Sequence, residues 1–157
     1  MPRVRAGWKG KYNMDKHEFY TAYHYALQYG KWKDRYEALG DTMQGIRYDR
    51  DHVIASPSPD GLLNAAAERA ELAEKIKHIE ETAQRVAPEI YPYLLKGVTE
   101  EGISYTYLRE VMMIPCGKNF YYSKRREFYW RLSRENRKEG HTGDKSRGYA
   151  GSVEIVR

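Results

Sequence analysis

Two stretches of the sequence carry apolar and aromatic residues at alternating steps of three and four, and this spacing limits the fold more than any other feature. Such steps place the residues on one face of a helix, and their average of about 3.5 residues is that of a coiled-coil seam. The first seam comprises Ala22, Tyr25, Tyr29, Trp32, Tyr36, Leu39 and Met43. The second comprises Leu62, Ala65, Arg69, Leu72, Ile76, Ile79, Ala83 and Val86. Because an apolar seam must be covered, the two stretches predict a pair of long, packed helices.

The boundaries of these helices follow from capping and helix-breaking residues. Asp15 can cap a first helix that starts near Lys16, and the second helix is predicted at Asp60–Val86. The segment between them, residues 44–59, contains one glycine and two prolines and is predicted to be a linker. A linker of this length allows an antiparallel hairpin within one chain, or a homo-oligomer in which the seams meet between copies. Arg69 is the one charged seam residue, and it is expected to extend to solvent or to pair with an acid.

After the second long helix, the pattern changes to a helix, a short turn and a basic helix. The first of these helices is predicted at Ser104–Met112, with Val111 on its apolar face. Residues 113–117 contain a proline and a glycine and are predicted to form the turn, with glycine supplying a positive φ. The second helix is predicted at about Lys118–Lys138. This order is typical of a helix-turn-helix, whose second helix lies in the major groove of DNA.

The predicted fold class is all-α, an antiparallel two-helix coiled-coil hairpin followed by the helix-turn-helix unit. A short helix at Glu89–Lys96, ended by Gly97, is expected to pack beneath the helix-turn-helix and complete a three-helix unit. The predicted organisation is a flexible basic arm at residues 1–13, the helical hairpin with its linker at 14–86, the DNA-binding unit at 87–138 and a disordered tail at 139–157.

The residues predicted to contact DNA lie on both helices of this motif. Lys118 and Asn119 are best placed for base edges, because lysine pairs well with guanine and asparagine with adenine. Polar and basic residues on the preceding helix are expected to contact phosphates. The full predicted set is Lys118, Asn119, Tyr122, Lys124, Arg125 and Arg126 on the second helix and Ser104, Thr106 and Arg109 on the first, while Tyr121, Phe128 and Leu132 are assigned to packing. The alternative is that residues 124–126 form only the solvated face of an amphipathic helix.

The distribution of charge supports a polyanionic partner. The chain of 157 residues has a formal net charge of +5, but residues 1–16 hold five basic and one acidic residue. Residues 117–157 hold eleven basic and five acidic residues, so the remaining middle of the chain is acidic. An acidic middle between basic ends indicates that a polyanion binds at the ends, and double-stranded DNA is the partner that fits the helix-turn-helix.

The sequence lacks the usual signs of a membrane protein, a secreted protein or an enzyme. No apolar run approaches the roughly 18 residues that cross a bilayer, and the basic N-terminus lacks the apolar segment of a secretory signal. The single cysteine, Cys116, cannot form an internal disulfide. The five histidines have no metal-binding spacing, and no phosphate-binding glycine loop or nucleophile elbow is present. We therefore expect a cytoplasmic protein that is not an enzyme, has no cofactor or metal site, and contacts no membrane.

The segment Ile114–Leu132, IPCGKNFYYSKRREFYWRL, resembles the C-terminal motif of small phage and prophage proteins of Firmicutes. These are the late-gene transcription regulators of the RinA type and their relatives, which carry a helix-turn-helix similar to region four of sigma factors. The resemblance in architecture extends over about residues 15–135, with a tyrosine-rich first helix, a Ser/Pro linker, a second long helix and then the DNA-binding unit. It implies a sequence-specific, double-stranded DNA-binding regulator of transcription from a phage or prophage.

Two other functions fit the same organisation. A small terminase-like DNA-packaging subunit would also combine a DNA-binding helix unit with an oligomerising coiled coil. An adaptor without DNA affinity would instead bind RNA polymerase or another host protein complex. In that second case, the exposed face of the hairpin is expected to be the functional surface.

Overall fold

The computed structural model describes residues 10–48 and 59–141, and the chain is helical over most of these two ranges. In chain order the elements are α1 (Lys16–Leu27), α2 (Tyr29–Tyr48), α3 (Pro59–Val86), the 3₁₀ helix η1 (Pro88–Ile90), α4 (Tyr91–Thr99), α5 (Tyr105–Glu110) and α6 (Lys118–His141). No β-strand occurs in the described ranges, so the predicted all-α class is confirmed. Within the same ranges, no helix is both long and apolar enough to cross a membrane. Most of the predicted basic arm, linker and tail lies outside the described residues.

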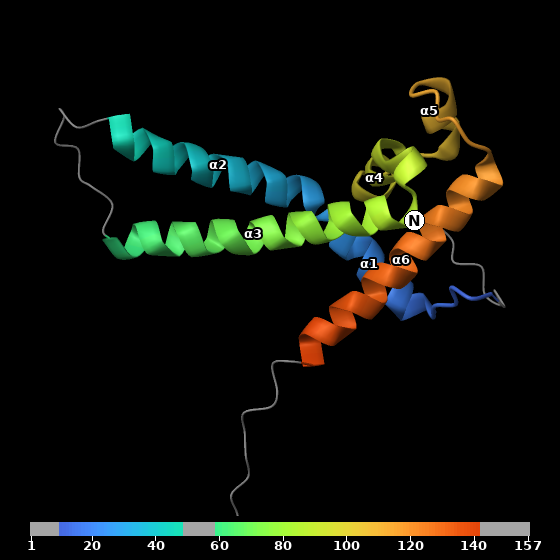
Figure 1. Ribbon diagram of the computed structural model, residues 1–157, viewed down its shortest axis with the longest axis horizontal. Coiled ribbons are helices and arrows are strands. Elements are labelled where there is room, and N and C mark those ends of the chain that lie inside the picture. Colours follow the sequence, from blue (N-terminus) through green and yellow to red (C-terminus); the bar gives the residue numbers. More distant parts are fainter. Residues whose placement is uncertain (1–9, 49–58, 142–157) are drawn as a thin grey trace, which may run out of the picture.

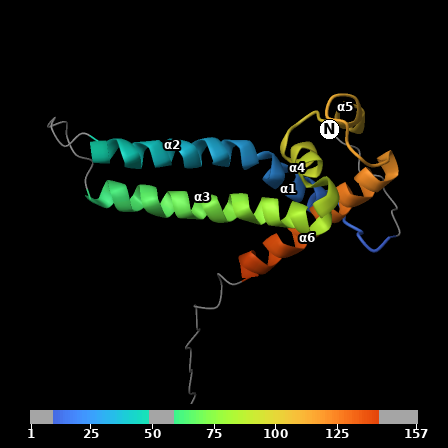
Figure 2. The same cartoon turned by 45° about the horizontal axis from the view of Figure 1, so that its top comes forward.

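Helices α2 and α3 form a hairpin that projects from the rest of the molecule (Figures 1 and 2). The two helices run side by side in opposite directions and pack against each other. Leu39 of α2 and Leu72 of α3 are buried, whereas Leu62 at the far end is half-buried and its neighbour Leu63 is 69% exposed. The two seams thus meet within one chain, and burial decreases toward the end of the hairpin.

The first seam is divided between two helices, so the prediction of one continuous helix was wrong. Helix α1 begins after Asp15, whose side chain accepts a 2.8 Å hydrogen bond from the N–H of Glu18, as the predicted cap requires. Helix α1 ends at Leu27, and after Gln28 the chain continues as α2. Helix α1 packs against α4 and α6, whereas α2 packs against α3. Because of this break, the first part of the seam packs in the head and the second part packs against α3.

Arg69 is accommodated inside the hairpin by an aromatic ring. Its guanidinium carbon lies 4.2 Å from the ring centroid of Tyr36, and its Nε donates a 3.4 Å hydrogen bond to the Tyr36 carbonyl. A cation over a ring face in this geometry is attracted by the negative face of the ring. Gly40 makes room for the guanidinium, because a Cβ at this position would approach Arg69 Nη2 to 2.9 Å. Arg69 therefore contacts an aromatic ring and a carbonyl, where the sequence predicted either extension to solvent or a pair with an acid.

The remaining helices, α1, η1, α4, α5 and α6, form a head whose core lies along α6. Tyr121, Phe128 and Leu132 are at most 1% exposed, which confirms their assignment to packing. They belong to a single buried cluster that also includes Ala22, Tyr23 and Ala26 of α1 and Leu94 and Val98 of α4. Helix α6 crosses the base of the hairpin and extends on both sides of it (Figure 1). The head is therefore organised around one long helix that contacts α1, α3 and α4.

Helix α4 continues through Gly97 to Thr99, so the predicted end of this helix at Gly97 was wrong. Gly97 is buried, and a Cβ on it would overlap the hydroxyl oxygen of Tyr121. Glycine is needed here because α6 lies so close to α4 that the Tyr121 side chain occupies the space of a side chain at position 97. The glycine marks a helix contact, not a helix end.

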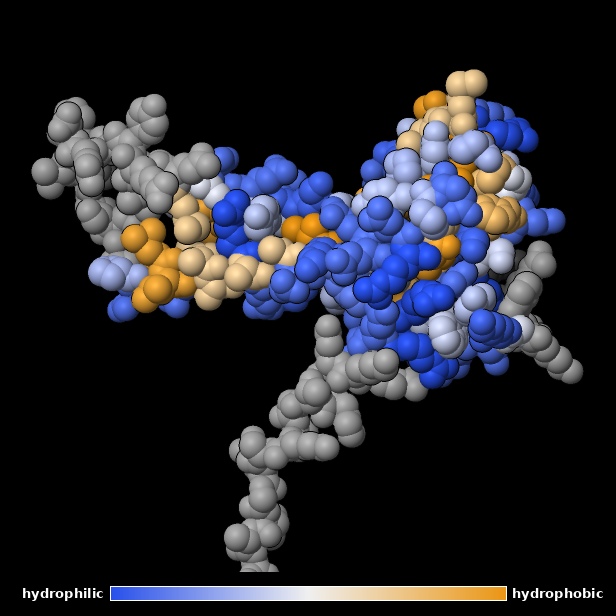
Figure 3. Space-filling view, viewed as in Figure 1, coloured by the Kyte–Doolittle hydropathy of each residue, from blue (hydrophilic) through white to orange (hydrophobic). Residues whose placement is uncertain are grey.

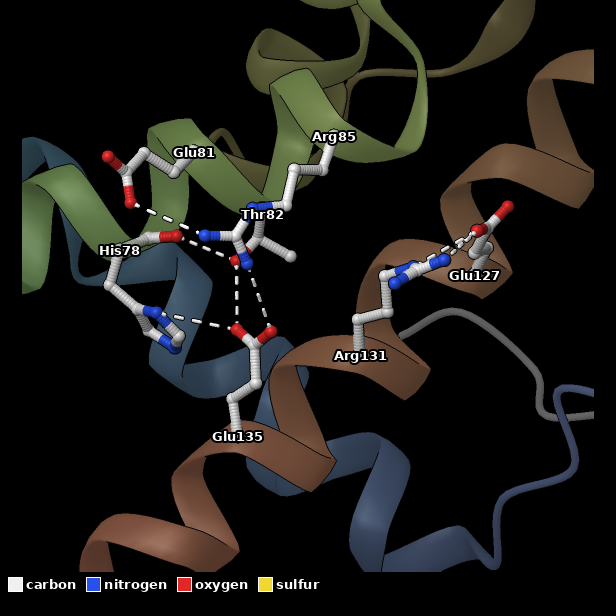
Figure 4. Close-up of polar contacts among 7 residues, drawn as sticks. All are labelled: His78, Glu81, Thr82, Arg85, Glu127, Arg131 and Glu135. Carbon is white, nitrogen blue, oxygen red and sulfur yellow. Dashed lines mark hydrogen bonds and ion pairs between the residues drawn. The ribbon is translucent and has the colours of Figure 1, made fainter.

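A polar clamp joins α3 to α6 where the two long helices cross (Figure 4). The carboxylate of Glu135 accepts 3.4 Å hydrogen bonds from Thr82 and Arg85, and it lies 3.5 Å from Nδ1 of His78. Thr82 is buried, and Glu135 is about 30% exposed. Three groups from successive turns of α3 thus converge on one carboxylate of α6 and fix the contact between the two helices.

Candidate nucleic-acid interface

The segment predicted to be a helix-turn-helix begins with a capped, short helix. The Ser104 hydroxyl accepts a 3.2 Å hydrogen bond from the N–H of Tyr107 and so caps α5. Helix α5 ends at Glu110, earlier than predicted, and Val111 becomes its C-cap. As a result Val111 is 62% exposed instead of lying on a buried face.

Two hydrogen bonds join the turn between α5 and α6 to α5. Met113 has a φ of 58°, so the positive φ falls here and not at the predicted glycine. The next residue, Ile114, is buried, and its N–H donates a 3.0 Å hydrogen bond to the carbonyl of Leu108. The hydroxyl of Tyr105, which is also in α5, donates a 2.7 Å hydrogen bond to the Cys116 carbonyl. These contacts hold the start of α6 in a fixed position beside α5.

The first turn of α6 presents polar and basic groups to solvent. Lys118 and Asn119 are both exposed, and Tyr122 in the next turn is 39% exposed. The first acidic residue of α6 is Glu127, and the whole helix contains eight basic and three acidic residues. The side chain of Asn119 offers both a donor and an acceptor for hydrogen bonds, whereas Lys118 supplies a positive charge.

The three consecutive basic residues of α6 point in different directions. Arg125 faces inward, where its guanidinium carbon lies 5.5 Å from the ring centroid of Tyr129 and its Nε is buried. Arg126 donates a 2.9 Å hydrogen bond from Nε to the carbonyl of Tyr12. Lys124 lies 3.6 Å from the Glu127 carboxylate. These residues therefore do not form one solvated face, and Arg125 does not occupy the exposed position that a DNA contact requires.

The residues of the α5 side that were predicted to contact phosphates are all exposed, but two of them already have interactions within the protein. Ser104 and Thr106 are exposed, although the hydroxyl of Ser104 is already used as the helix cap. Arg109 is also exposed, and its Nη2 lies 3.1 Å from the carboxylate of Glu110. An exposed ion pair of this kind is weak, so Arg109 can exchange this partner for another anion.

Apolar side chains share the corner of the head that contains α5 and the turn. Figure 3 shows this apolar surface near α5. The most exposed members are Val111 and Met113, the latter at 80%, and Tyr107 and Phe120 are partly exposed. The sequence did not predict this patch, because helical spacing placed Val111 on a buried face. The candidate interface therefore combines polar and basic groups on α6 with an apolar rim from α5 and the turn.

The sequence analysis also missed a group of residues beside the middle of α6. Tyr12 packs its ring on that of Trp130, with a centroid separation of 5.4 Å, and Met14 is buried in the head. The end of the predicted flexible arm is therefore anchored to α6. A signal was present in the sequence, because steps of four from Lys118 give only basic and aromatic residues, namely Lys118, Tyr122, Arg126, Trp130, Arg134 and Lys138.

Comparison with known proteins gives no relative for this chain. No protein-family model matches the sequence, no curated protein matches it, and no solved structure matches the fold.

Proposed function

We propose that this chain binds double-stranded DNA through the N-terminal part of α6, as a helix-turn-helix protein. The observation that carries the proposal is the exposure of Lys118 and Asn119 on the first turn of α6, at a corner of the head where the first acidic residue of the helix is nine positions away. A long helix that ends freely in solvent with this side-chain set can enter a major groove.

The local electrostatics favour an anionic partner at this end of the helix. The first N–H groups of a helix have no partner within the helix, and the aligned peptide dipoles give this end a partial positive charge. Lys118 adds a full positive charge, and Asn119 can form paired hydrogen bonds with adenine. Thr106 and Arg109 lie on the adjacent short helix, where phosphate contacts would orient the head. Arg125 is left out of the proposed contacts because its side chain is buried against Tyr129.

The role in regulation of transcription rests on the resemblance of Ile114–Leu132 to phage and prophage regulators of the RinA type. In this proposal the head binds a specific site on the DNA. The hairpin, which projects away from α5 and the start of α6 in Figure 1, remains available for other contacts.

The proposal is tested by fluorescence anisotropy with random duplex DNA across a salt series. Lys118→Ala should weaken binding and lower the slope of log K against log salt by about one, as expected for one lost phosphate neighbour. Lys33→Ala on α2 is the matched control, since Lys33 is an exposed lysine on a helix of the hairpin and should leave the slope unchanged. Absence of wild-type binding at low salt, or equal behaviour of the two variants, would overturn the proposal.

A second candidate is a protein-binding adaptor, and the exposed apolar residues Val111 and Met113 favour it. Exposed apolar patches of this kind commonly mark protein interfaces. The test is a pull-down of purified bacterial RNA polymerase by the wild type and by Val111→Ser/Met113→Ser. Capture that the double variant abolishes, in a chain without DNA affinity, would make the adaptor the better conclusion. Equal capture by both proteins, or none, would remove it.

A further inference from the structure

A continuous strip of cationic and aromatic side chains lies beside the middle of α6, where the chain before α1 packs against it. We name it the Tyr12 strip; its members are Lys11, Tyr12, Arg126, Trp130 and Arg134. Arg126 donates a hydrogen bond from Nε to the Tyr12 carbonyl, and the Tyr12 ring contacts the Trp130 ring. The guanidinium carbon of Arg134 lies 5.5 Å from the Trp130 ring centroid. Lys11 lies 5.7 Å from the centroid of the Tyr12 ring.

The cations at the two ends of the strip keep their positive charge available. Lys11 is exposed, and its observed contact is with a neutral ring. Arg134 is half-buried and also contacts a ring, and its Nε is buried without a hydrogen-bond partner among the described residues. A ring face attracts a cation without neutralising it, so the surface retains a net positive potential. Such a surface attracts a polyanion.

The strip is continuous with the proposed DNA-binding end of α6. Along the row of residues at steps of four from Lys118, every residue is basic or aromatic and no carboxylate occurs. The neighbouring row that starts at Asn119 contains three glutamates, Glu127, Glu135 and Glu139. The row from Lys118 turns by about 40° around α6 at each step, and it carries no negative charge from the first turn of the helix to the strip.

The spacing along this ridge matches the dimensions of a DNA duplex. Arg126 follows Lys118 by eight residues, which is about 12 Å at 1.5 Å per residue. The major groove is also about 12 Å wide. When Lys118 is in the groove, Arg126 lies about one groove width along the axis and about 80° around it, on the side of α6 next to the flanking phosphates. Arg134 lies about 12 Å farther along the helix and about a further 80° around it.

The aromatic rings of the strip do not favour a single-stranded partner. Base stacking requires an open ring face. Arg134 lies over Trp130, Tyr12 packs against the same ring, and Lys11 lies over Tyr12. The rings thus position the cations instead of offering a stacking platform, and this arrangement fits the phosphates of a duplex.

We infer that the Tyr12 strip is a second DNA contact, which binds the phosphate backbone of the same duplex that α6 enters with its first turn. The inference rests on the proposed function, because it assigns the flanking contacts of that DNA complex. The sequence before Lys11 adds three further basic residues and no acidic ones, namely Arg3, Arg5 and Lys9. The chain that leads into the strip therefore adds positive charge to the same partner.

The test uses the full chain with Lys11→Gln/Arg134→Gln, and Lys31→Gln/Lys33→Gln on α2 as the control with the same loss of charge. Anisotropy across a salt series on random duplex DNA should show a slope lower by about two for the strip variant, one for each lost phosphate contact. The control variant should retain the wild-type slope. Circular dichroism should show equal helix content in the three proteins, because neither substitution of the strip variant removes a buried apolar side chain.

The outcomes separate this inference from the proposed function. Loss of slope in the strip variant, together with weaker binding by Lys118→Ala, supports the strip. Loss of slope in the strip variant without an effect of Lys118→Ala overturns the inference that the strip binds the duplex that α6 enters. An unchanged slope in the strip variant, alongside weaker binding by Lys118→Ala, overturns the strip and leaves the proposed function standing. No binding by the wild type overturns both. A larger loss with single-stranded DNA than with duplex overturns the assignment of the strip to duplex phosphates.

Discussion

The hairpin and the head are both built from helices rich in aromatic residues, but they bury these residues to different depths. In the head, Tyr121, Phe128 and Tyr129 are almost fully buried, because α6 is covered by α1, α3 and α4. In the hairpin, Trp32 and Tyr36 are half-buried, because two helices can cover only one side of each other. A seam of period 3.5 predicts that a helix has a partner. It does not predict how many layers cover that partner.

In the hairpin, cationic side chains cover aromatic rings that are only half-buried. Arg69 lies over Tyr36, and Nζ of Lys75 lies 5.7 Å from the Trp32 ring centroid. These two side chains of α3 thus cover aromatic rings of α2. The head uses buried side chains for the same purpose, so its stability should depend more strongly on single core residues.

The largest expected difference comes from truncating one leucine in each region. Leu132 of the head is fully buried, whereas Leu62 of the hairpin is half-buried. Leu132→Ala should lower the free energy of unfolding by about 2–5 kcal/mol, through lost burial and a residual cavity. Leu62→Ala should cost less than about 1 kcal/mol, because little apolar surface is newly exposed there. Urea denaturation followed by circular dichroism measures both, and equal costs would contradict the proposed difference between the regions.

A smaller effect is expected at the closest helix contact of the head. Gly97→Ala places a Cβ where the Tyr121 hydroxyl lies, and this overpacking should cost about 1–3 kcal/mol. Tyr121→Phe removes the hydroxyl oxygen, which is buried without a hydrogen-bond partner among the described residues. The double variant Gly97→Ala/Tyr121→Phe should therefore recover most of the loss. A double-mutant cycle by thermal unfolding tests this, and additive costs would show that the two residues are not coupled.

The smallest effect is expected for the surface ion pair of the hairpin. Nε of Arg35 lies 2.7 Å from the Glu68 carboxylate, and both side chains are about half exposed. The hydrogen bond from Arg35 lowers the pKa of Glu68 below its usual value. A lowered folded-state pKa means that the pair stabilises the hairpin above the ordinary carboxyl pKa and loses this contribution as the pH falls through the folded-state pKa.

Arg35→Ala should return the pKa of Glu68 toward its ordinary value, which NMR titration of the carboxyl group can measure. High salt should produce most of the same change in the wild type, because exposed pairs are screened. A pKa of Glu68 that is the same in the wild type and the variant would show that the pair does not form in solution.

Much of the fold could be predicted from local patterns. The helical periods identified the long helices, and Asp15 and Ser104 marked helix starts that the structure contains. The break at Gln28 could not be predicted, because the steps of three and four continue through it without interruption. The extension of α4 past Gly97 depends on Tyr121, which follows 24 residues later in the sequence. A contact between residues this far apart in the sequence cannot be predicted from the residues near Gly97.

The candidate site was predictable in part, and one available signal was not used. Exposure of Lys118 and Asn119 follows from their place at the start of a helix after a turn. The inward direction of Arg125 follows from steps of four, since it lies between Tyr121 and Tyr129 on the same face of α6. Steps of four from Tyr121, which the sequence assigns to packing, place Arg125 on the same side of α6, whatever the charge of its immediate neighbours.

The clamp at Glu135 has a mechanical consequence for the far end of α6. Glu135 follows Lys118 by 17 residues, which is about 25 Å of helix. A rotation of α6 by about 10° around the clamp would move Lys118 by roughly 4 Å, a large fraction of one helical turn. The hairpin shares α3 with this clamp, so the hairpin and the long helix of the head are joined through one helix. A molecule bound to the hairpin would therefore contact the same helix that holds α6 in place.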